Sequence, residues 1–248
     1  MEFLRIKTVR EKLNGNLPFS LELMMKKYLL MMSLSAFTAP VWAAGQAVLQ
    51  SSINGQTEQV QVSWLSDQQL RMDITRPPAE ILLQNGALSA ITQIGGMPIV
   101  ANVADVDQMA RALGQGGGFS GQIDKQLAKS VTAFEATGRL ETVAGVPGEI
   151  YRMTWRDEQG KAHTDEAVLT KNATVVELSR ALQNLGVAAH KGWDARSAEI
   201  LHRGLGVLRY AKAYQLQSVS TQAPAASALA LPDQSIDVQK LMQGLTGH

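Results

Sequence analysis

Apolar and polar side chains alternate along the first half of this 248-residue chain, and this alternation constrains the fold more than any other feature of the sequence. A period of two is typical of a strand with one buried face. Asn54-Gly55 separates two such segments, and Asn-Gly is the strongest short-range signal for a hairpin turn. The sequence therefore predicts an antiparallel sheet here. The apolar positions of its two clearest strands are Val60, Val62, Trp64, Leu70, Met72 and Ile74.

Turns and prolines divide this half of the chain into strands. Arg76-Pro77-Pro78 ends the third strand, because proline has no N–H to donate to a ladder. Asn85-Gly86 and Gly95-Gly96 mark two of the next turns. The strands we expect are Ala47–Ile53, Gln59–Leu65, Leu70–Thr75, Glu80–Gln84, Leu88–Ile94 and Pro98–Val103.

The pattern changes to a helical one after this sheet. Asp105 is a good N-cap for a helix that ends at Leu113. A second helix is expected at Ile123–Phe134, shorter if Val131 begins a strand. The glycine-rich segment Gly114–Gly121 between them lacks the Gly-Lys-Ser/Thr ending of a phosphate loop. We therefore interpret it as a flexible lid or a hinge.

The second half of the chain mixes strands and helices. Tyr151, Met153 and Trp155 share one face of its clearest strand. Helices grouped between strands, rather than alternating with them, predict an α+β fold, a strongly bent antiparallel sheet with helices covering one face. The expected strands are Glu135–Glu141, Glu149–Trp155, His163–Thr170 and Val207–Thr221, the last broken near Lys212. The expected helices are Thr174–Gly186, with Val175, Leu178, Leu182 and Leu185 on its apolar face, and Ser197–Gly204.

Residues 25–43 have the features of a secretory signal peptide. Two lysines precede a short apolar segment, and Val41-Trp42-Ala43 fits a cleavage site before Ala44. The apolar segment is shorter than the roughly 20 residues that span a bilayer. We expect residues 1–24 to be a mis-assigned N-terminal extension, and the alternative is a long n-region or a cytoplasmic tail ahead of an uncleaved anchor. We expect a single domain at 44–221 and a flexible C-terminal tail at 222–248. Within this tail we expect Gln222–Leu231 to be a linker or an extended strand, and Ile236–Leu245 can form a short helix.

Composition narrows the classes of partner. Without residues 1–43, 205 residues remain, with 17 Lys and Arg against 19 Asp and Glu, a net charge of about −2. This charge gives no electrostatic basis for nucleic-acid binding. The chain has no cysteine, which excludes an acylated lipoprotein and leaves stability to the hydrophobic core. We expect a periplasmic protein with no integral membrane segment after cleavage.

No group of residues in the sequence indicates a catalytic or metal site. The histidines show none of the close spacings that are typical of metal ligands. His163 lies near Asp165 and Glu166, a combination suited to acid–base chemistry, but such residues beside a turn are more often a solvated strand end. We expect no enzyme activity and no cofactor. The four histidines are His163, His190, His202 and His248.

Three segments resemble periplasmic domains related to the LolA/LolB lipoprotein-carrier fold, namely Leu70–Asp73, Ile81–Gly86 and Glu141–Trp155. The resemblance covers most of residues 47–181. It implies an unclosed half-barrel with helices over a hydrophobic cavity for acyl chains. The residues that would then line the cavity as a candidate ligand site are Trp64, Leu70, Met72, Ile74, Tyr151, Met153 and Trp155.

These residues have two interpretations that the sequence leaves open. They can form the wall of a cavity, where methionines adapt to variable apolar ligands, or they can form a core sealed by the helices. The first implies a non-enzymatic binding protein for a lipid or lipoprotein ligand. The second implies a cell-envelope structural or interaction module that binds a protein partner. A hydrolase would need His163 close to a carboxylate and a serine hydroxyl in a cleft.

Overall fold

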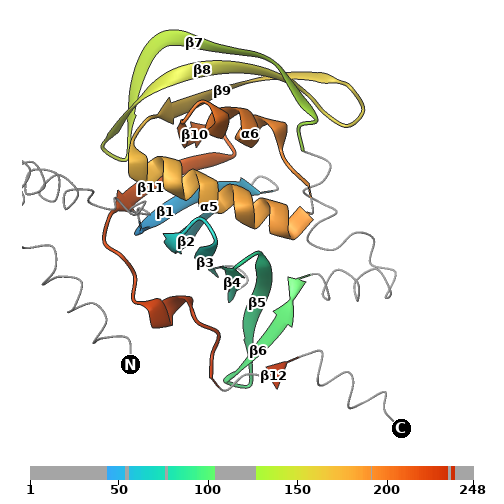
Figure 1. Cartoon of the computed structure of the whole chain (residues 1–248), viewed down its shortest axis with the longest axis vertical. Helices are drawn as coiled ribbons and strands as arrows, with labels where there is room; N and C mark the ends of the chain where they lie inside the picture. The colour runs from blue at the N-terminus through green and yellow to red at the C-terminus, as the bar shows by residue number, and fades with distance from the viewer. Residues whose placement is uncertain are drawn as a thin grey trace, which may run out of the picture. The chain divides into compact units, whose positions relative to one another are not determined.

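The computed structural model describes residues 44–53, 56–75, 78–103, 127–190, 192–233 and 236–237. These residues form one twelve-stranded sheet in the order β12-β6-β5-β4-β3-β2-β1-β11-β10-β9-β8-β7 (Figure 1). Neighbouring strands are antiparallel except for the short pair β12–β6, which is parallel. The strands at the two ends, β7 and β12, do not pair with each other, so the described sheet is not closed.

The alternating segments of the sequence form the expected strands. Six strands come before residue 103 and the other six after residue 129. The first six are β1 (Gly45–Ile53), β2 (Gln56–Ser66), β3 (Gln69–Thr75), β4 (Pro78–Gln84), β5 (Ala87–Ile94) and β6 (Met97–Asn102). The others are β7 (Ser130–Val143), β8 (Val146–Arg156), β9 (Ala162–Thr170), β10 (Gly206–Tyr210), β11 (Tyr214–Ser220) and β12 (Ile236–Asp237).

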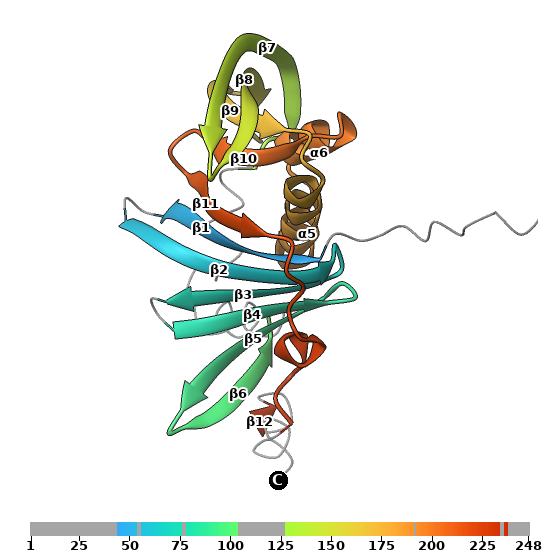
Figure 2. The same ribbon diagram turned by 90° about the vertical axis from the view of Figure 1, so that its left-hand side faces the viewer.

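Two helices, α5 (Ala173–His190) and α6 (Ala195–His202), cover one face of the bent sheet. Figure 2 shows both helices on the same side of the stacked strands, with β7 arching beside α6. This arrangement confirms the expected α+β class and the unclosed half-barrel. The sheet bends because strand registers shift at several β-bulges, which increase local twist.

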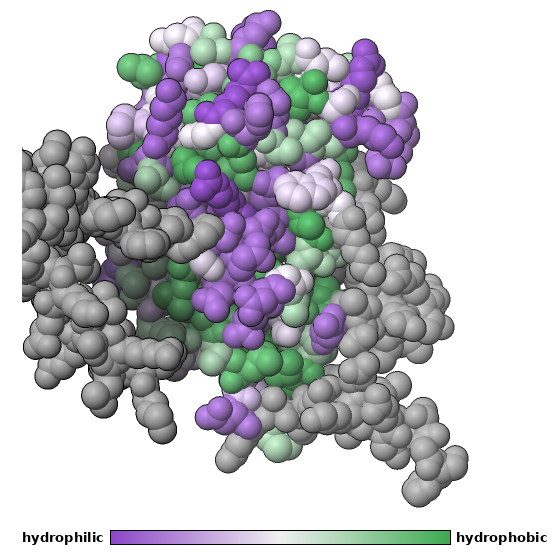
Figure 3. All heavy atoms as spheres, in the orientation of Figure 1, coloured by the Kyte–Doolittle hydropathy of each residue, from purple (hydrophilic) through white to green (hydrophobic). Residues whose placement is uncertain are grey.

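Helix α5 packs onto the sheet by the apolar face that its sequence predicts. Val175 and Leu178 are completely buried, and Leu182 and Leu185 pack against the same cluster. The opposite face of the helix is polar and carries the ion pair between Arg180 and Glu177. In the space-filling view, polar residues cover the middle of α5 while apolar residues gather beside it (Figure 3). Burial of one stripe therefore holds this helix on the sheet.

The helix expected at Ile123–Phe134 is wrong over its described residues, because residues 127–129 are not helical and β7 begins at Ser130, next to the strand start at Val131 that was the alternative. A β-bulge after Val131 adds one residue to the strand, so Val131 and Phe134 both pack against the cluster around Met153. Apolar residues three apart imitate the period of a helix, and the bulge explains the error. The strand expected at Glu135–Glu141 is part of β7. The helix expected at Asp105–Leu113, the loop Gly114–Gly121 and the turn Asn54-Gly55 lie outside the described residues.

The tail beyond residue 221 is packed where a linker was expected. Residues Ala226–Leu229 form a 3₁₀ helix, η2, and Leu229 is buried against Leu82 and Ile91. Arg71 Nη1 donates to the Ala228 carbonyl at 3.1 Å, and Gln84 Nε2 donates to the Leu229 carbonyl at 2.6 Å. Residues 236–237, expected to begin a short helix, form β12 beside β6 instead.

The packed tail leads to a first prediction. We expect Leu229→Ala to lower the free energy of unfolding by about 2–4 kcal/mol, because a buried leucine loses its contacts and leaves a cavity. Leu231→Ala is the matched control, since Leu231 lies in the same tail with 41% of its surface exposed. It should change stability by no more than about 0.5 kcal/mol. Urea unfolding of both variants measures the difference, and equal stabilities would mean that the tail does not contribute to the fold.

Candidate functional site

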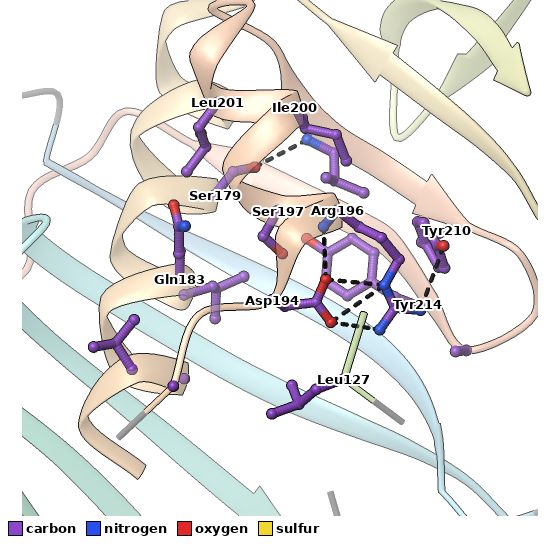
Figure 4. Close-up of a pocket in the computed structure, with 16 residues that line it drawn as sticks. Leu127, Ser179, Gln183, Asp194, Arg196, Ser197, Ile200, Leu201, Tyr210 and Tyr214 are labelled. Atoms are coloured by element: carbon purple, nitrogen blue, oxygen red, sulfur yellow. Dashed lines mark hydrogen bonds and ion pairs between the residues drawn. The ribbon is translucent and has the colours of Figure 1, made fainter. Parts of the chain in front are cut away.

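A cavity of about 320 Å³ lies between α5, α6 and the hairpin that joins β10 to β11 (Figure 4). Its volume is at the lower end of the roughly 300–1,000 Å³ that is typical of small-molecule sites. Helix α5 forms one wall, α6 forms another, and β10 and β11 close the third side. The cavity therefore lies between the two helices and the sheet.

The walls of the cavity are mainly apolar. Leu182 and Val187 come from α5, Ile200 and Leu201 from α6, and Val207 from β10. Gly186 of α5 also lines the cavity, and a Cβ built on it would meet no atom within 4 Å. The cavity thus offers apolar contacts and has free space beside the helix backbone.

One end of the cavity is formed by an ion pair. Asp194 is the N-cap of α6, and its Oδ1 accepts a hydrogen bond from the Arg196 backbone N–H at 2.8 Å. The Arg196 side chain returns to the same carboxylate, with Nε 2.9 Å from Oδ1 and Nη2 2.5 Å from Oδ2. Burial disfavours the guanidinium charge, but the bonds and charge of Asp194 outweigh it and raise the Arg196 pKa above its usual value. The Arg196 side chain therefore stays charged, and the Asp194 carboxylate balances this charge.

Aromatic rings hold this ion pair in place. The Arg196 guanidinium lies 4.2 Å from the centre of the Trp155 ring and 5.3 Å from that of Tyr210. Trp155 Nε1 and the Tyr210 hydroxyl each donate to Asp165 Oδ2 at 2.7 Å. Burial raises the pKa of Tyr210, so its hydroxyl stays a donor. These contacts join β8, β9, β10 and α6 at the end of the cavity.

His163 contacts two residues of the β8–β9 hairpin. Its Nε2 lies 2.8 Å from Asp157 Oδ2, and its ring stacks on Trp155 with the centroids 4.3 Å apart. The bond to His163 lowers the pKa of the Asp157 carboxyl.

Two further kinds of feature were searched for among the described residues. No group of three or more potential ligands there could hold a metal ion. No helix there is both long and apolar enough to cross a membrane.

The ion pair gives a second prediction. We expect Arg196→Met to lower the free energy of unfolding by about 3 kcal/mol, because the largely buried Asp194 carboxyl group would lose its ion-pair partner. Arg139→Met is the matched control, since the Arg139–Glu166 pair is exposed and such pairs contribute about 0–1 kcal/mol. Chemical denaturation measures both. A loss for Arg196→Met no larger than for the control would contradict a structural role for this pair.

Two polar atoms of the cavity residues have no hydrogen-bond partner in the described structure. They are Gln183 Nε2 on α5 and the Tyr214 hydroxyl on β11, and both atoms are buried. Burial raises the pKa of Tyr214, so its hydroxyl is protonated. Ser179, on the same wall, differs, because its Oγ donates to the Val175 carbonyl and accepts from the Val207 N–H.

The seven residues expected to line a cavity lie in and around the core. Trp64 and Leu70 are completely buried under α5, and Met72 and Ile74 pack against the same cluster. Met153 and Tyr151 belong to a second cluster, which also contains Ile200 of α6. Trp155 lies under the Arg196 guanidinium. The described lining of the cavity contains none of the seven, and Trp155 approaches it through Arg196.

The residues that do line the cavity were missed in the sequence, although α5 carries a signal for them. Ser179, Gln183 and Gly186 follow one another at spacings of four and three, so they lie on one side of the helix. A small or polar stripe beside the apolar face of a helix indicates that large apolar side chains do not fill this side. Tyr214 and Arg196 gave no comparable signal, because their positions depend on the arrangement of the strands.

No family model matches the chain, and no curated protein matches its sequence. The chain is similar to the crystal structure of MucB, with 17% identity, a TM-score of 0.33 and coverage of 77% of this chain and 58% of that one. It is also similar to the Pseudomonas aeruginosa MucA/MucB complex, with 14% identity, a TM-score of 0.27 and coverage of 76% and 56%. The chain thus spans little more than half the length of each. At these scores the similarities carry no functional argument, and the chain's own structure defines an α+β protein with an unclosed half-barrel.

Proposed function

We propose that this chain is a periplasmic, non-enzymatic binding protein for an apolar or lipidic ligand, with the acyl chain held between the helices and the sheet. The observation that supports this most is the cavity of about 320 Å³ between α5, α6 and the β10–β11 hairpin. Five aliphatic side chains from both helices and β10 face it. Removing apolar ligand surface from water there would contribute about 25 cal/mol per Å².

The filled core beneath the cavity sets the size of the ligand. Trp64 and Leu70 are completely buried, so the space under α5 is occupied by the protein itself. A short acyl chain fits without rearrangement. A longer chain would require α5 to move away from the sheet, and Met72 and Ile74 would then line the enlarged cavity together with the tryptophan and leucine. In this proposal Trp64, Leu70, Met72 and Ile74, which the sequence analysis expected to line a cavity, contact the ligand only when α5 moves.

The periplasmic assignment is part of the proposal. It is supported by the signal-like residues 25–43. The chain has no cysteine that could be acylated as in a lipoprotein.

A fluorescent fatty acid tests this function directly. We expect its emission to rise on mixing with the purified protein and to saturate at one probe per chain, because the cavity is mainly apolar and its volume of about 320 Å³ suits one small ligand. Excess unlabelled fatty acid should reverse the rise. An emission that grows linearly with protein, without saturation, would exclude the proposed site.

A second function, binding to a cell-envelope protein, is favoured by the sheet edge at β7. Leu140 of this strand is 81% exposed, and the outer edge of β7 has no neighbouring strand in the described sheet. Such an edge can accept a strand from a partner. A photo-crosslinker at position 140 should then trap a protein in cells, while one at the exposed Gln217 should not. Equal trapping at both positions would argue against this function.

A further inference from the structure

The segment between α5 and α6 carries an exposed tryptophan beside the cavity. Gly192 and Asp194 both line the cavity, whereas Trp193 between them is absent from the described lining and is 63% exposed. The other tryptophans among the described residues, Trp64 and Trp155, are 0% and 6% exposed. A single exposed apolar residue is common on protein surfaces, so the surroundings of Trp193 decide what it indicates.

Two exposed lysines lie on the other segments that border the same part of the cavity. Lys129 is two residues after the lining residue Leu127, and Lys212 directly precedes the lining residue Ala213. In the described part of the chain, neither lysine side chain takes part in an ion pair or a hydrogen bond. Both charges are therefore available to a partner in solution.

Hydrogen bonds bring these segments together at the start of α6. The Ala128 N–H donates to Asp194 Oδ2 at 3.4 Å, and the Ala195 N–H donates to the Ala128 carbonyl at 3.0 Å. Arg196 Nη1 donates to the Tyr210 hydroxyl at 3.5 Å, which links the β10–β11 hairpin to the same turn of helix. Figure 4 shows Leu127 beside Asp194 at this end of the cavity.

The charge that this end of the cavity presents to solvent is positive. Segments 127–129, 192–194 and 210–214 contain three charged residues, namely Lys129, Asp194 and Lys212. Asp194 is paired with Arg196 inside the protein. The two lysines and Trp193 thus form an exposed surface that combines one large apolar side chain with two cations. We call these three the rim residues.

We infer that the rim residues dock on an anionic phospholipid bilayer, with Trp193 at the membrane interface and both lysines near the lipid phosphates. Tryptophan is enriched where headgroups meet acyl chains, and each lysine near an anionic bilayer strengthens binding. Reversible membrane binding needs only two such weak signals, whereas a stable protein interface buries a wider surface. A lipid would then pass between bilayer and cavity with less of its acyl chain exposed to water.

This inference rests on the proposed function, because it assigns the surface from which the ligand of the same cavity is taken up. Co-sedimentation with vesicles tests it. We expect the purified protein to bind equimolar phosphatidylcholine–phosphatidylglycerol vesicles about tenfold more tightly than vesicles of phosphatidylcholine alone, and added salt should weaken this binding. Equal binding to both vesicles, or binding to neither, would overturn the inference. Saturable binding of a fluorescent fatty acid by the same sample would still support the proposed function.

Two variants test the apolar contact. Trp193→Ser should weaken binding to the anionic vesicles by about tenfold. Leu140→Ser is the matched control, since Leu140 is 81% exposed on β7 and is not part of the described cavity lining. Both side chains are mostly exposed, so both variants should fold, and Trp193→Ser should bind soluble fatty acid as the wild type does. Equal losses of vesicle binding in the two variants would overturn the inference.

Substitution of the lysines tests the charge. The double variant Lys129→Gln, Lys212→Gln should lose about tenfold or more in affinity for the anionic vesicles and show a weaker dependence on salt. Lys171→Gln is the matched control, because Lys171 is exposed and precedes the other end of α5. If Lys171→Gln reduced the affinity as much as the double variant, the attraction would come from the whole surface and the inference would be wrong.

Quenching by lipids locates Trp193 directly. Phospholipids brominated along the acyl chain quench a tryptophan that reaches them. We expect quenching of the vesicle-bound wild type and little in Trp193→Phe, because the other described tryptophans are buried. Equal quenching of the two proteins would overturn the assignment of Trp193. A photo-crosslinker at position 193 that traps a protein and no lipid in cells would also overturn the inference, in favour of a protein partner.

Discussion

Gly206→Ala is expected to lower the free energy of unfolding by about 3 kcal/mol or more. Gly206 begins β10 and is buried against the start of α5. A Cβ at this position would lie 2.6 Å from the Val175 carbonyl carbon and the Val176 nitrogen, and 2.7 Å from the Val175 oxygen. Backbone atoms inside a helix cannot rotate away as a side chain does, so α5 would have to move off the sheet.

Urea unfolding measures this effect, and Gly186→Ala is the matched control. Both substitutions add one methyl group, but the methyl at position 186 meets no atom within 4 Å. In the middle of α5 it should stabilise the protein by about 0.5–1 kcal/mol, because alanine has the higher helix propensity. If Gly206→Ala were as stable as the wild type, the close approach of α5 to β10 would be wrong.

Gly186→Phe is expected to reduce the affinity for an apolar ligand by at least about tenfold. The same free space that makes alanine harmless at this position allows a benzyl group to enter the cavity from α5. The aromatic ring would then cover the aliphatic wall formed by Leu182 and Val187. Titration of a fluorescent fatty acid into the variant measures the loss.

Two controls separate loss of the site from loss of the fold. Gly186→Ala should bind the probe as the wild type does, because a methyl group occupies little of the 320 Å³ cavity. The circular dichroism and melting temperature of Gly186→Phe should remain close to those of Gly186→Ala. Unchanged probe affinity in a folded Gly186→Phe variant would place the ligand elsewhere.

The sheet could be predicted because its signals are local. Val60, Val62 and Trp64 alternate with polar residues, and all three are buried on one face of β2. The helix expected at Thr174–Gly186 forms as α5 (Ala173–His190) for the same reason, since Leu178 and its neighbours recur at helical spacing. In both cases the period of the side chains matches the period of the backbone.

The features that could not be predicted depend on residues far apart in the sequence. The bulge in β7 breaks the period of two, so Val131 and Phe134 imitated a helix. The cavity lies between α5, α6 and β10, and no periodicity in the sequence encodes how these elements are spaced. Tyr214 and Gln183 are 31 positions apart in the sequence, so their meeting in one cavity required the fold. The packing of Leu229 likewise depends on Leu82 and Ile91 of distant strands.

Native mass spectrometry of the protein purified from the envelope fraction, with organic extraction of the same sample, tests the central claim most directly. We predict one population heavier than the bare chain by a single small amphiphile, which is released on activation and recovered in the extract. Denaturation before the measurement should remove the extra mass. A bare mass alone, together with no uptake of added fluorescent fatty acid, would contradict a ligand-binding function and favour the protein-binding alternative at β7.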